Sequence, residues 1–173
     1  MNPGTNANAE SPMEDITPLI TALHGATVQK RVAAAAALGK SGKSSAIPAL
    51  IQALSDPHWK VRQESAHALG RLGDEDAIPA LISCLTDPEP AVQIAGIAAV
   101  GRIRDHRATD ALISCLKDTD DRVRIASAVV LGRLGDHRAI RPLEELGRDR
   151  FEEVRVTAED ALRRIRKVLT RNS

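Results

Sequence analysis

A chain of 173 residues is long enough for one domain, and 43% of its residues are hydrophobic, which is ample for a core. The charges nearly cancel, with 24 Lys and Arg against 23 Asp and Glu, and this argues against a general nucleic-acid binder, which would be clearly basic. No apolar run approaches the roughly 20 residues that span a bilayer, no signal peptide is visible, and two cysteines exclude a disulfide framework, so we expect a cytoplasmic protein.

Residues 1–13 show no apolar periodicity and are predicted to form a flexible N-terminal tail. Beyond them the chain repeats every 31 residues: Leu38, Leu69, Val100 and Leu131 are each followed by Gly and then by Lys or Arg. A fixed period of this size predicts stacked copies of one small helical unit, each burying its apolar face only against its neighbours. The predicted units cover residues 14–42, 43–73, 74–104, 105–135 and 136–169.

Each unit is expected to contain two helices. The first begins near residues 77–79 and has an apolar stripe at helical spacing, with Pro79 in the first turn, where a missing N–H costs little. The second is expected to start directly after the Asp-Pro pairs at 56–57 and 87–88, with aspartate as the cap and proline at the first helical position.

The second helix is expected to end at a glycine in the left-handed conformation, and Gly42, Gly73 and Gly135 fit this role. Arg104 replaces that glycine in the third unit and predicts a strained or differently closed turn, at a cost of about 1 kcal/mol. The last helix, from Glu152 to about residue 170, carries charge where a further unit would dock, as expected for the end of a solenoid.

The repeat resembles the short HEAT-type repeats of the phycobilin-lyase class. The matching residues are Val61-Arg62, Ala66, Ala68-Leu69-Gly70, Leu72-Gly73-Asp74, Ala77-Ile78-Pro79 and Leu81. The resemblance implies an all-α, right-handed α-α solenoid of about five HEAT-like helix pairs, whose second helices line a concave face. Tetratricopeptide and ankyrin repeats are excluded because their signatures are absent.

The resemblance also implies three functions. Deoxyhypusine hydroxylases of this class hold two irons through His-Glu pairs, but the matching pairs here contain one carboxylate, Glu64, so we reject that activity. We expect a non-catalytic adaptor that binds another protein and needs no cofactor. The alternative is a protein that binds a bilin, a linear tetrapyrrole, or a lyase-like subunit that acts on a phycobiliprotein. Nucleic acid is not expected, because aromatic residues for base stacking are almost absent.

The expected contacts lie on the concave face, where units three and four would present an apolar strip of Ile94, Ile125 and Val129. The competing interpretation is that neighbouring helices partly cover these residues. Unit two would place a tryptophan, in a short loop, beside a polar cluster, either as a binding anchor or packed under its own loop. The predicted partner-binding residues are Trp59, Gln63, Glu64, His67, Arg71, Ile94, Arg102, Ile125, Val129 and Arg133.

Two ladders of cations recur with the repeat. The first could bind an anionic partner or compensate helix dipoles, and it comprises Lys40, Arg71, Arg102, Arg133 and Arg164. The second is interrupted by Gln93 and is expected to tie successive units together; it comprises Arg31, Arg62, Arg124 and Arg155, with Asp56, Asp87, Asp118 and Asp149.

The remaining reactive side chains are given structural roles. Cys84 and Cys115 are 31 residues apart, too distant for a disulfide between stacked units, and are expected to be small core residues. His106 and His137 are expected in solvated turns, too far apart to share a metal ion. The sequence therefore predicts neither a catalytic site nor a metal site.

Overall fold

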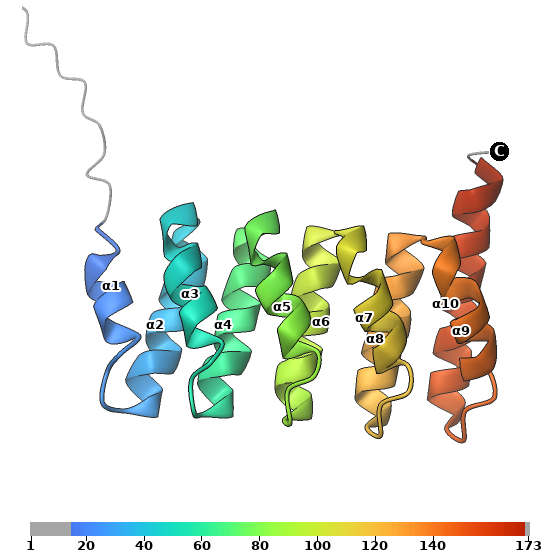
Figure 1. The fold of residues 1–173 in the computed structure, drawn as a ribbon, viewed down its shortest axis with the longest axis horizontal. Helices are drawn as coiled ribbons and strands as arrows, with labels where there is room; N and C mark the ends of the chain where they lie inside the picture. Colours follow the sequence, from blue (N-terminus) through green and yellow to red (C-terminus); the bar gives the residue numbers. More distant parts are fainter. Residues whose placement is uncertain (1–14, 172–173) are drawn as a thin grey trace, which may run out of the picture.

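The computed structural model describes residues 15–171, so the predicted tail lies outside the described residues. Helices and short 3-10 turns, with no strand in this part of the chain, form a single row of stacked pairs (Figure 1). The helices are α1 (Thr17–Ala22), α2 (Val28–Ser41), α3 (Ile47–Ala53), α4 (Trp59–Leu72), α5 (Ile78–Cys84), α6 (Pro90–Ile103), α7 (Thr109–Cys115), α8 (Asp121–Leu134), α9 (Ile140–Leu146) and α10 (Glu152–Arg171). The predicted all-α solenoid is confirmed.

The first helix of each pair is short and follows a tight turn. Four 3-10 turns, of which η2 (Glu75–Ala77) is typical, lead into α3, α5, α7 and α9. Pro79 lies in the first turn of α5, as predicted, and Pro48 has the same place in α3. Each proline stands where a helix leaves its N–H groups unbonded, so it fixes the start of the helix at little cost.

The second helices start later than the sequence predicts. α4 begins at Trp59 and is capped by His58, whose Nδ1 accepts the Lys60 N–H at 3.2 Å. The expected cap, Asp56, instead accepts the His58 N–H at 2.8 Å and is held by Arg31 through two further hydrogen bonds of 2.6 and 2.9 Å. The predicted start after the Asp-Pro pair is therefore wrong, because an arginine from the preceding unit engages the carboxylate.

The second helices end as predicted. Gly42, Gly73 and Gly135 follow α2, α4 and α8 with φ of 68°, 73° and 76°. Arg104 ends α6 with φ 61° and donates its N–H to the Val100 carbonyl at 2.9 Å. The turn after α6 is therefore closed in the same left-handed way, and the arginine carries the strain that a β-carbon suffers there.

The glycine of each Leu-Gly pair has a different purpose, which the sequence did not reveal. A β-carbon added to Gly70 would lie 2.7 Å from the Cα of Ala99 on α6, and one added to Gly39 would lie equally close to Ala68 on α4. Gly132 repeats this approach to Ala161 on α10 at 2.8 Å. The glycines therefore let consecutive second helices touch backbone to backbone.

The two layers of the stack are spaced differently. The second helices pack extensively on one another, whereas the first helices have few direct contacts among themselves. A stack whose layers differ in spacing curves toward the more closely spaced layer. We therefore expect the second helices to line the concave side, and we call them the inner layer and the first helices the outer layer.

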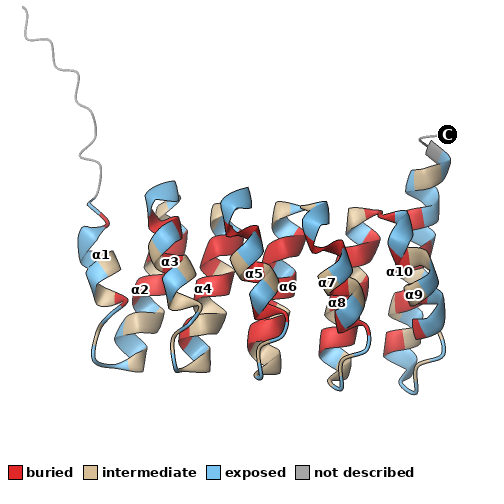
Figure 2. Cartoon of the chain, in the orientation of Figure 1, coloured by how far each residue is buried: buried red, intermediate tan, exposed pale blue. Residues whose placement is uncertain are grey.

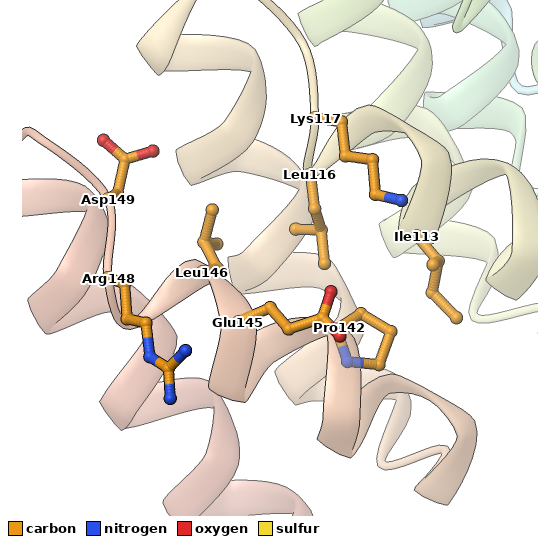
Figure 3. A pocket seen from close by; sticks show the side chains of 8 residues that line it. All are labelled: Ile113, Leu116, Lys117, Pro142, Glu145, Leu146, Arg148 and Asp149. Carbon is orange, nitrogen blue, oxygen red and sulfur yellow. The ribbon is translucent and has the colours of Figure 1, made fainter.

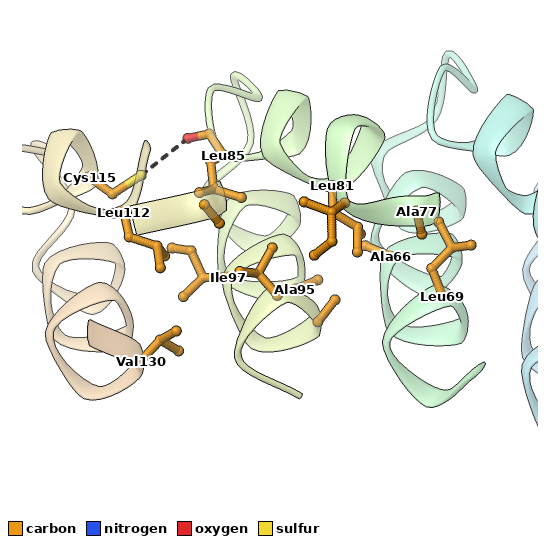
Figure 4. Packing of buried hydrophobic residues seen from close by; sticks show 14 of the residues in the cluster. Ala66, Leu69, Ala77, Leu81, Leu85, Ala95, Ile97, Leu112, Cys115 and Val130 are labelled. Atoms are coloured by element: carbon orange, nitrogen blue, oxygen red, sulfur yellow. Dashed lines mark hydrogen bonds between the residues drawn. The ribbon is translucent and has the colours of Figure 1, made fainter. Parts of the chain in front are cut away.

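The core lies where the layers meet. Leu69, Leu81, Ile97 and Leu112 are completely buried and interdigitate along the stack (Figure 4). Buried residues follow the sides on which neighbouring helices pack, and exposed residues follow the outward sides of the first helices (Figure 2). None of the helices between residues 15 and 171 is long and apolar enough to cross a membrane.

The stack ends in a charged helix, as predicted. α10 carries Arg163 at the repeat position that is glycine in α2, α4, α6 and α8. The Arg163 side chain is 77% exposed and bonds to Asp160 at 2.9 Å. Its bulk occupies the place at which a further helix would have to approach.

Candidate functional site

The ten predicted contact residues all lie on the inner layer, on α4, α6 and α8, and none is buried. Trp59, Gln63, His67 and Arg71 are four residues apart and therefore share one side of α4. The predicted loop position of Trp59 is wrong, because the tryptophan is the first residue of α4. The predicted residues therefore lie together on the inner layer.

The polar cluster of unit two is internally paired. Arg71 Nη2 donates to Glu64 Oε1 at 2.6 Å. Burial lowers the pKa of the half-buried His67; the Glu64 charge opposes this shift, while Arg71 and Arg102 add to it. His67 is therefore neutral at pH 7, and the charge of Glu64 is already engaged.

Trp59 lies at the edge of this face. Its half-buried indole stacks on His58 with ring centroids 6.1 Å apart, and the Lys60 ammonium lies 5.4 Å from the ring centre. It does not belong to the buried core cluster. The indole is thus held by polar neighbours and keeps part of its surface open.

The apolar strip is partly covered. Ile94 and Ile125 are half-buried and pack against the core, while Val129 lines a small hollow of about 110 Å³ with Asp160 and Arg164 of α10. Val156 has the same repeat position as Ile94 and Ile125 and is 50% exposed, so it extends the strip onto α10. The sequence analysis left Val156 out of the strip, although the shared repeat position was the signal.

One neighbour of the strip does not reach the surface. Ala95 of α6 occupies the repeat position of Glu64, which lies on α4 of the inner layer, but it is only 1% exposed. Its single methyl group is too short to extend past the surrounding side chains, and it joins the core. The apolar surface of unit three is therefore contributed by Ile94 and the exposed Ala98.

The first cation ladder follows one edge of the concave face. Lys40, Arg71, Arg102 and Arg133 are exposed in the last turns of α2, α4, α6 and α8. There they compensate the negative ends of the helix dipoles. Between residues 15 and 171, however, neither Arg102 nor Arg133 has an acidic side chain within 4 Å. Their charges are thus available to an anionic group, and both interpretations of the ladder stand.

The second cation ladder ties successive units together, as predicted. Arg62 Nε and Nη2 donate to the Asp87 carboxylate at 2.7 and 2.8 Å, and Arg124 does the same to Asp149 at 2.8 and 3.1 Å. Where the ladder is interrupted, Gln93 Nε2 makes one hydrogen bond of 3.2 Å to Asp118. The aspartates therefore bind the arginines. The N-cap positions of α4 and α8, predicted for aspartates of the ladder, are occupied by the later residues His58 and Asp120.

Grooves run between consecutive first helices, beside these ion pairs. The groove between α7 and α9 is lined by Leu116, Pro142 and Asp149, among others, and measures about 220 Å³ (Figure 3). The equivalent groove between α3 and α5 measures about 230 Å³. The groove between α5 and α7, which Gln93 lines, measures about 540 Å³. Sequence reasoning missed this groove, although the substituted arginine was its signal.

The cysteines and histidines take the structural roles expected of them. Cys84 and Cys115 are free and buried, and burial raises the pKa of the Cys84 thiol to about 12. His106 and His137 are exposed in 3-10 turns. Within the described part of the chain, no three His, Cys, Asp or Glu side chains are grouped so that they could hold a metal ion.

Two layers of helices that recur every 31 residues define an α-solenoid repeat protein. The sequence pattern of HEAT repeats matches residues 16–91 and 78–163, so the chain belongs to the HEAT-repeat family. A comparison with curated proteins gives no match.

Solved structures show which stacks the chain resembles. It is similar to a chain in the complex of CpcE and CpcF of phycocyanin lyase from Nostoc sp. PCC7120, with 27% identity and a TM-score of 0.77, over 96% of this chain and 71% of that one. The predicted resemblance to the phycobilin-lyase class is therefore confirmed.

Designed armadillo repeat proteins share the fold. One, in complex with the peptide (KR)4, has 19% identity and a TM-score of 0.70, over 87% of this chain and 81% of its own. Another, computationally designed for modular peptide recognition, has 19% identity and a TM-score of 0.66, over 86% of this chain and 81% of its own. At this identity the likeness concerns the architecture alone.

Proposed function

We propose that this chain is a non-catalytic adaptor that binds a segment of another protein on its concave face. The observation that carries the proposal is the half-buried apolar strip of Ile94, Ile125, Val129 and Val156 on the inner layer. A contiguous apolar surface on a face that the stack itself leaves open is typical of a protein-binding site.

The charges beside the strip specify the chemistry of the partner. Arg102 and Arg133 stand in adjacent units and have no acidic partner within 4 Å among the described residues. A segment with apolar side chains toward the strip and carboxylates toward these guanidinium groups would satisfy both. The similar CpcE and CpcF chains of phycocyanin lyase form a complex with each other, which supports a protein partner.

Site-specific crosslinking in cells tests the proposal. A photoreactive benzoylphenylalanine at position 129 faces the strip, and one at Arg141 of α9 marks the outer layer. We expect the position 129 probe to capture a defined partner, and Arg102→Glu with Arg133→Glu to abolish that capture while leaving the circular dichroism spectrum unchanged. Capture that is equal from both positions, or that survives the double charge reversal, would contradict the proposal.

A bilin-handling role is the second candidate. It is supported by the 27% identity to the phycocyanin lyase structure, and Arg102 and Arg133 could pair with the propionate groups of a linear tetrapyrrole. The hollow beside Val129 measures about 110 Å³, well below the roughly 300 Å³ at which small-molecule pockets begin. Under this candidate a bilin would therefore lie on the surface of the inner layer, and it would be the cofactor of the protein.

Absorption spectroscopy separates the two candidates. A linear tetrapyrrole bound in a fixed conformation would show a sharpened, red-shifted band that Arg102→Ala and Arg133→Ala abolish. We expect the spectrum to stay unchanged on addition of the protein, as the adaptor proposal requires. The cytoplasmic location expected from the sequence stays a prediction.

A further inference from the structure

We propose that the groove between α5 and α7 binds the guanidinium group of an arginine side chain from a partner protein. This site lies on the outer layer and is independent of what the concave face binds. It occupies the unit boundary at which the second cation ladder is interrupted, between Gln93 of α6 and Asp118.

The other boundaries show what this environment is built to hold. Arg62 makes two hydrogen bonds to the Asp87 carboxylate and donates Nη1 to the carbonyl oxygens of Asp56 and Pro57 at 3.0 and 3.3 Å. Arg124 repeats the arrangement with the Asp149 carboxylate and the carbonyl oxygens of Asp118 and Thr119. Each boundary thus offers one carboxylate and a pair of carbonyl oxygens to a planar, forked cation.

At the boundary between units three and four, the carboxylate of Asp118 remains, but Gln93 replaces the arginine. Gln93 reaches Asp118 with a single hydrogen bond of 3.2 Å. Its Oε1 is buried without a hydrogen-bond partner, in a residue that is only 9% exposed. A buried acceptor of this kind is costly unless a donor reaches it, and a guanidinium group beside Asp118 supplies donors to both.

No cation of the described chain serves Asp118. Among residues 15–171, no Lys, Arg or His nitrogen lies within 4 Å of its carboxylate. Arg124 reaches only the Asp118 carbonyl, at 2.8 Å, because its other nitrogens are engaged by Asp149. The Asp118 carboxylate accepts the Asp120 N–H at 2.8 Å and the Gln93 amide at 3.2 Å, and a cation that pairs with its charge would come from another molecule.

The groove has room for such a side chain. Its volume is about 540 Å³, compared with about 230 and 220 Å³ for the hollows between α3 and α5 and between α7 and α9, and about 450 Å³ for a hollow beside Arg124 and Asp149. Ile82, Leu85 and Ala111 line it and offer apolar walls to the methylene stem of an arginine. The neighbouring Cys115 thiol is turned aside and donates to the Leu85 carbonyl at 3.7 Å (Figure 4).

An NMR titration with short peptides tests the site. The probes are acetyl-Gly-Arg-Gly-amide, its lysine counterpart, and its citrulline counterpart, which keeps the shape but lacks the charge. We expect the arginine peptide to shift the side-chain amide signals of Gln93 saturably. The lysine peptide should bind more weakly, since an ammonium group lacks the fork, and the citrulline peptide at least tenfold more weakly.

Variants of the chain provide the controls. Gln93→Arg restores the ladder, so we expect it to fold with a higher thermal midpoint and to lose binding of the arginine peptide, read from the backbone amide signals of Thr86 and Ser114. Asp118→Asn should also lose binding. Arg133→Glu, which disables the concave face, should leave the titration unchanged, so the two proposals can fail separately. Equal binding of the arginine and citrulline peptides, or undiminished binding by Gln93→Arg, would overturn the inference.

Discussion

The inner and outer layers of this solenoid are held together by different forces. Inner helices meet through contacts as close as that of Gly70 with Ala99, where no side chain intervenes. Outer helices are separated by grooves, and the loops that follow α3, α5 and α9 are each held by an arginine of the preceding inner helix, as Asp149 is held by Arg124 of α8. The contacts between inner helices are therefore intolerant of added atoms, whereas the connection between an inner helix and the next outer helix can lose its arginine, as it has at Gln93 of α6.

The largest expected effect comes from adding bulk to the inner layer. Gly70→Val places a β-carbon 2.7 Å from Ala99, and because valine favours helix more than glycine does, any loss of stability arises from packing. We expect the free energy of unfolding to fall by about 3 kcal/mol in urea denaturation. Ala98→Val, on the exposed side of α6, is the control and should change it by less than about 0.5 kcal/mol. Equal effects would refute the proposed close approach.

The next largest effect comes from removing a second arginine that links an inner helix to the next outer helix. Arg124 is 7% exposed, and Arg124→Gln would reproduce the arrangement of Gln93, with a neutral amide beside Asp149. We expect a loss of about 2 kcal/mol, below the full cost of stranding a buried charge because the amide keeps one hydrogen bond. Arg122→Gln removes an exposed pair with Asp120 and should have no measurable effect. If Arg124→Gln lowered the free energy of unfolding no more than Arg122→Gln does, the second cation ladder would not hold successive units together.

A smaller effect of opposite sign is expected at the end of α6. Arg104→Gly relieves a left-handed conformation at φ 61° and should raise the free energy of unfolding by about 1 kcal/mol. Gly73→Arg is the matched reversal, since no heavy atom lies within 4 Å of a β-carbon placed there. It should lower stability by a similar amount, and thermal denaturation of the pair measures both. If Arg104→Gly left the stability unchanged, contacts of the Arg104 side chain would have to offset the strain of its left-handed backbone.

The smallest expected effect is a pH dependence on the inner layer. Burial lowers the pKa of His67 in the folded state, so the unfolded chain binds a proton more readily there. The contribution of His67 is therefore fully present above its ordinary pKa of about 6.5 and is lost as the pH falls toward the folded value. Urea denaturation at pH 7.5 and at pH 5.5 gives the decrease in the free energy of unfolding between the two pH values. This decrease should be smaller for His67→Gln than for His137→Gln, which alters an exposed histidine of the outer layer. Identical decreases would exclude His67 as the source.

The repeat predicted the stack well because each unit needs only its neighbours. It predicted the roles of individual positions less well. Gly70 and Gly73 recur equally in the sequence, yet one permits a helix contact and the other closes a turn at positive φ. Asp56 followed by proline has the local form of a helix cap, but an ion pair with Arg31, 25 residues away, decides its position. Local patterns fail where a tertiary partner competes for the same atoms.

The candidate site was predicted to a similar degree. The contact residues lie on the expected helices because their repeat positions fix the side of each helix. Ala95 is buried because the side chains around it extend further from the helix than its methyl group does. That packing is not visible in a single sequence. The α5–α7 groove depends on the pairing of Gln93 with Asp118, which the interrupted ladder signalled only once the geometry joined the two.

The arginine at the glycine position of α10 also bears on how copies of this chain assemble. Head-to-tail contact between identical repeat stacks does not close into a ring unless the rotation allows it, and otherwise it propagates as a filament. Such propagation would require the last inner helix of one molecule to pack against the first inner helix of the next. The two helices would have to approach as closely as α8 and α10 do at Gly132 and Ala161. The exposed side chain of Arg163 is too large to allow so close an approach. An arginine at this position is therefore expected to oppose head-to-tail stacking of identical molecules.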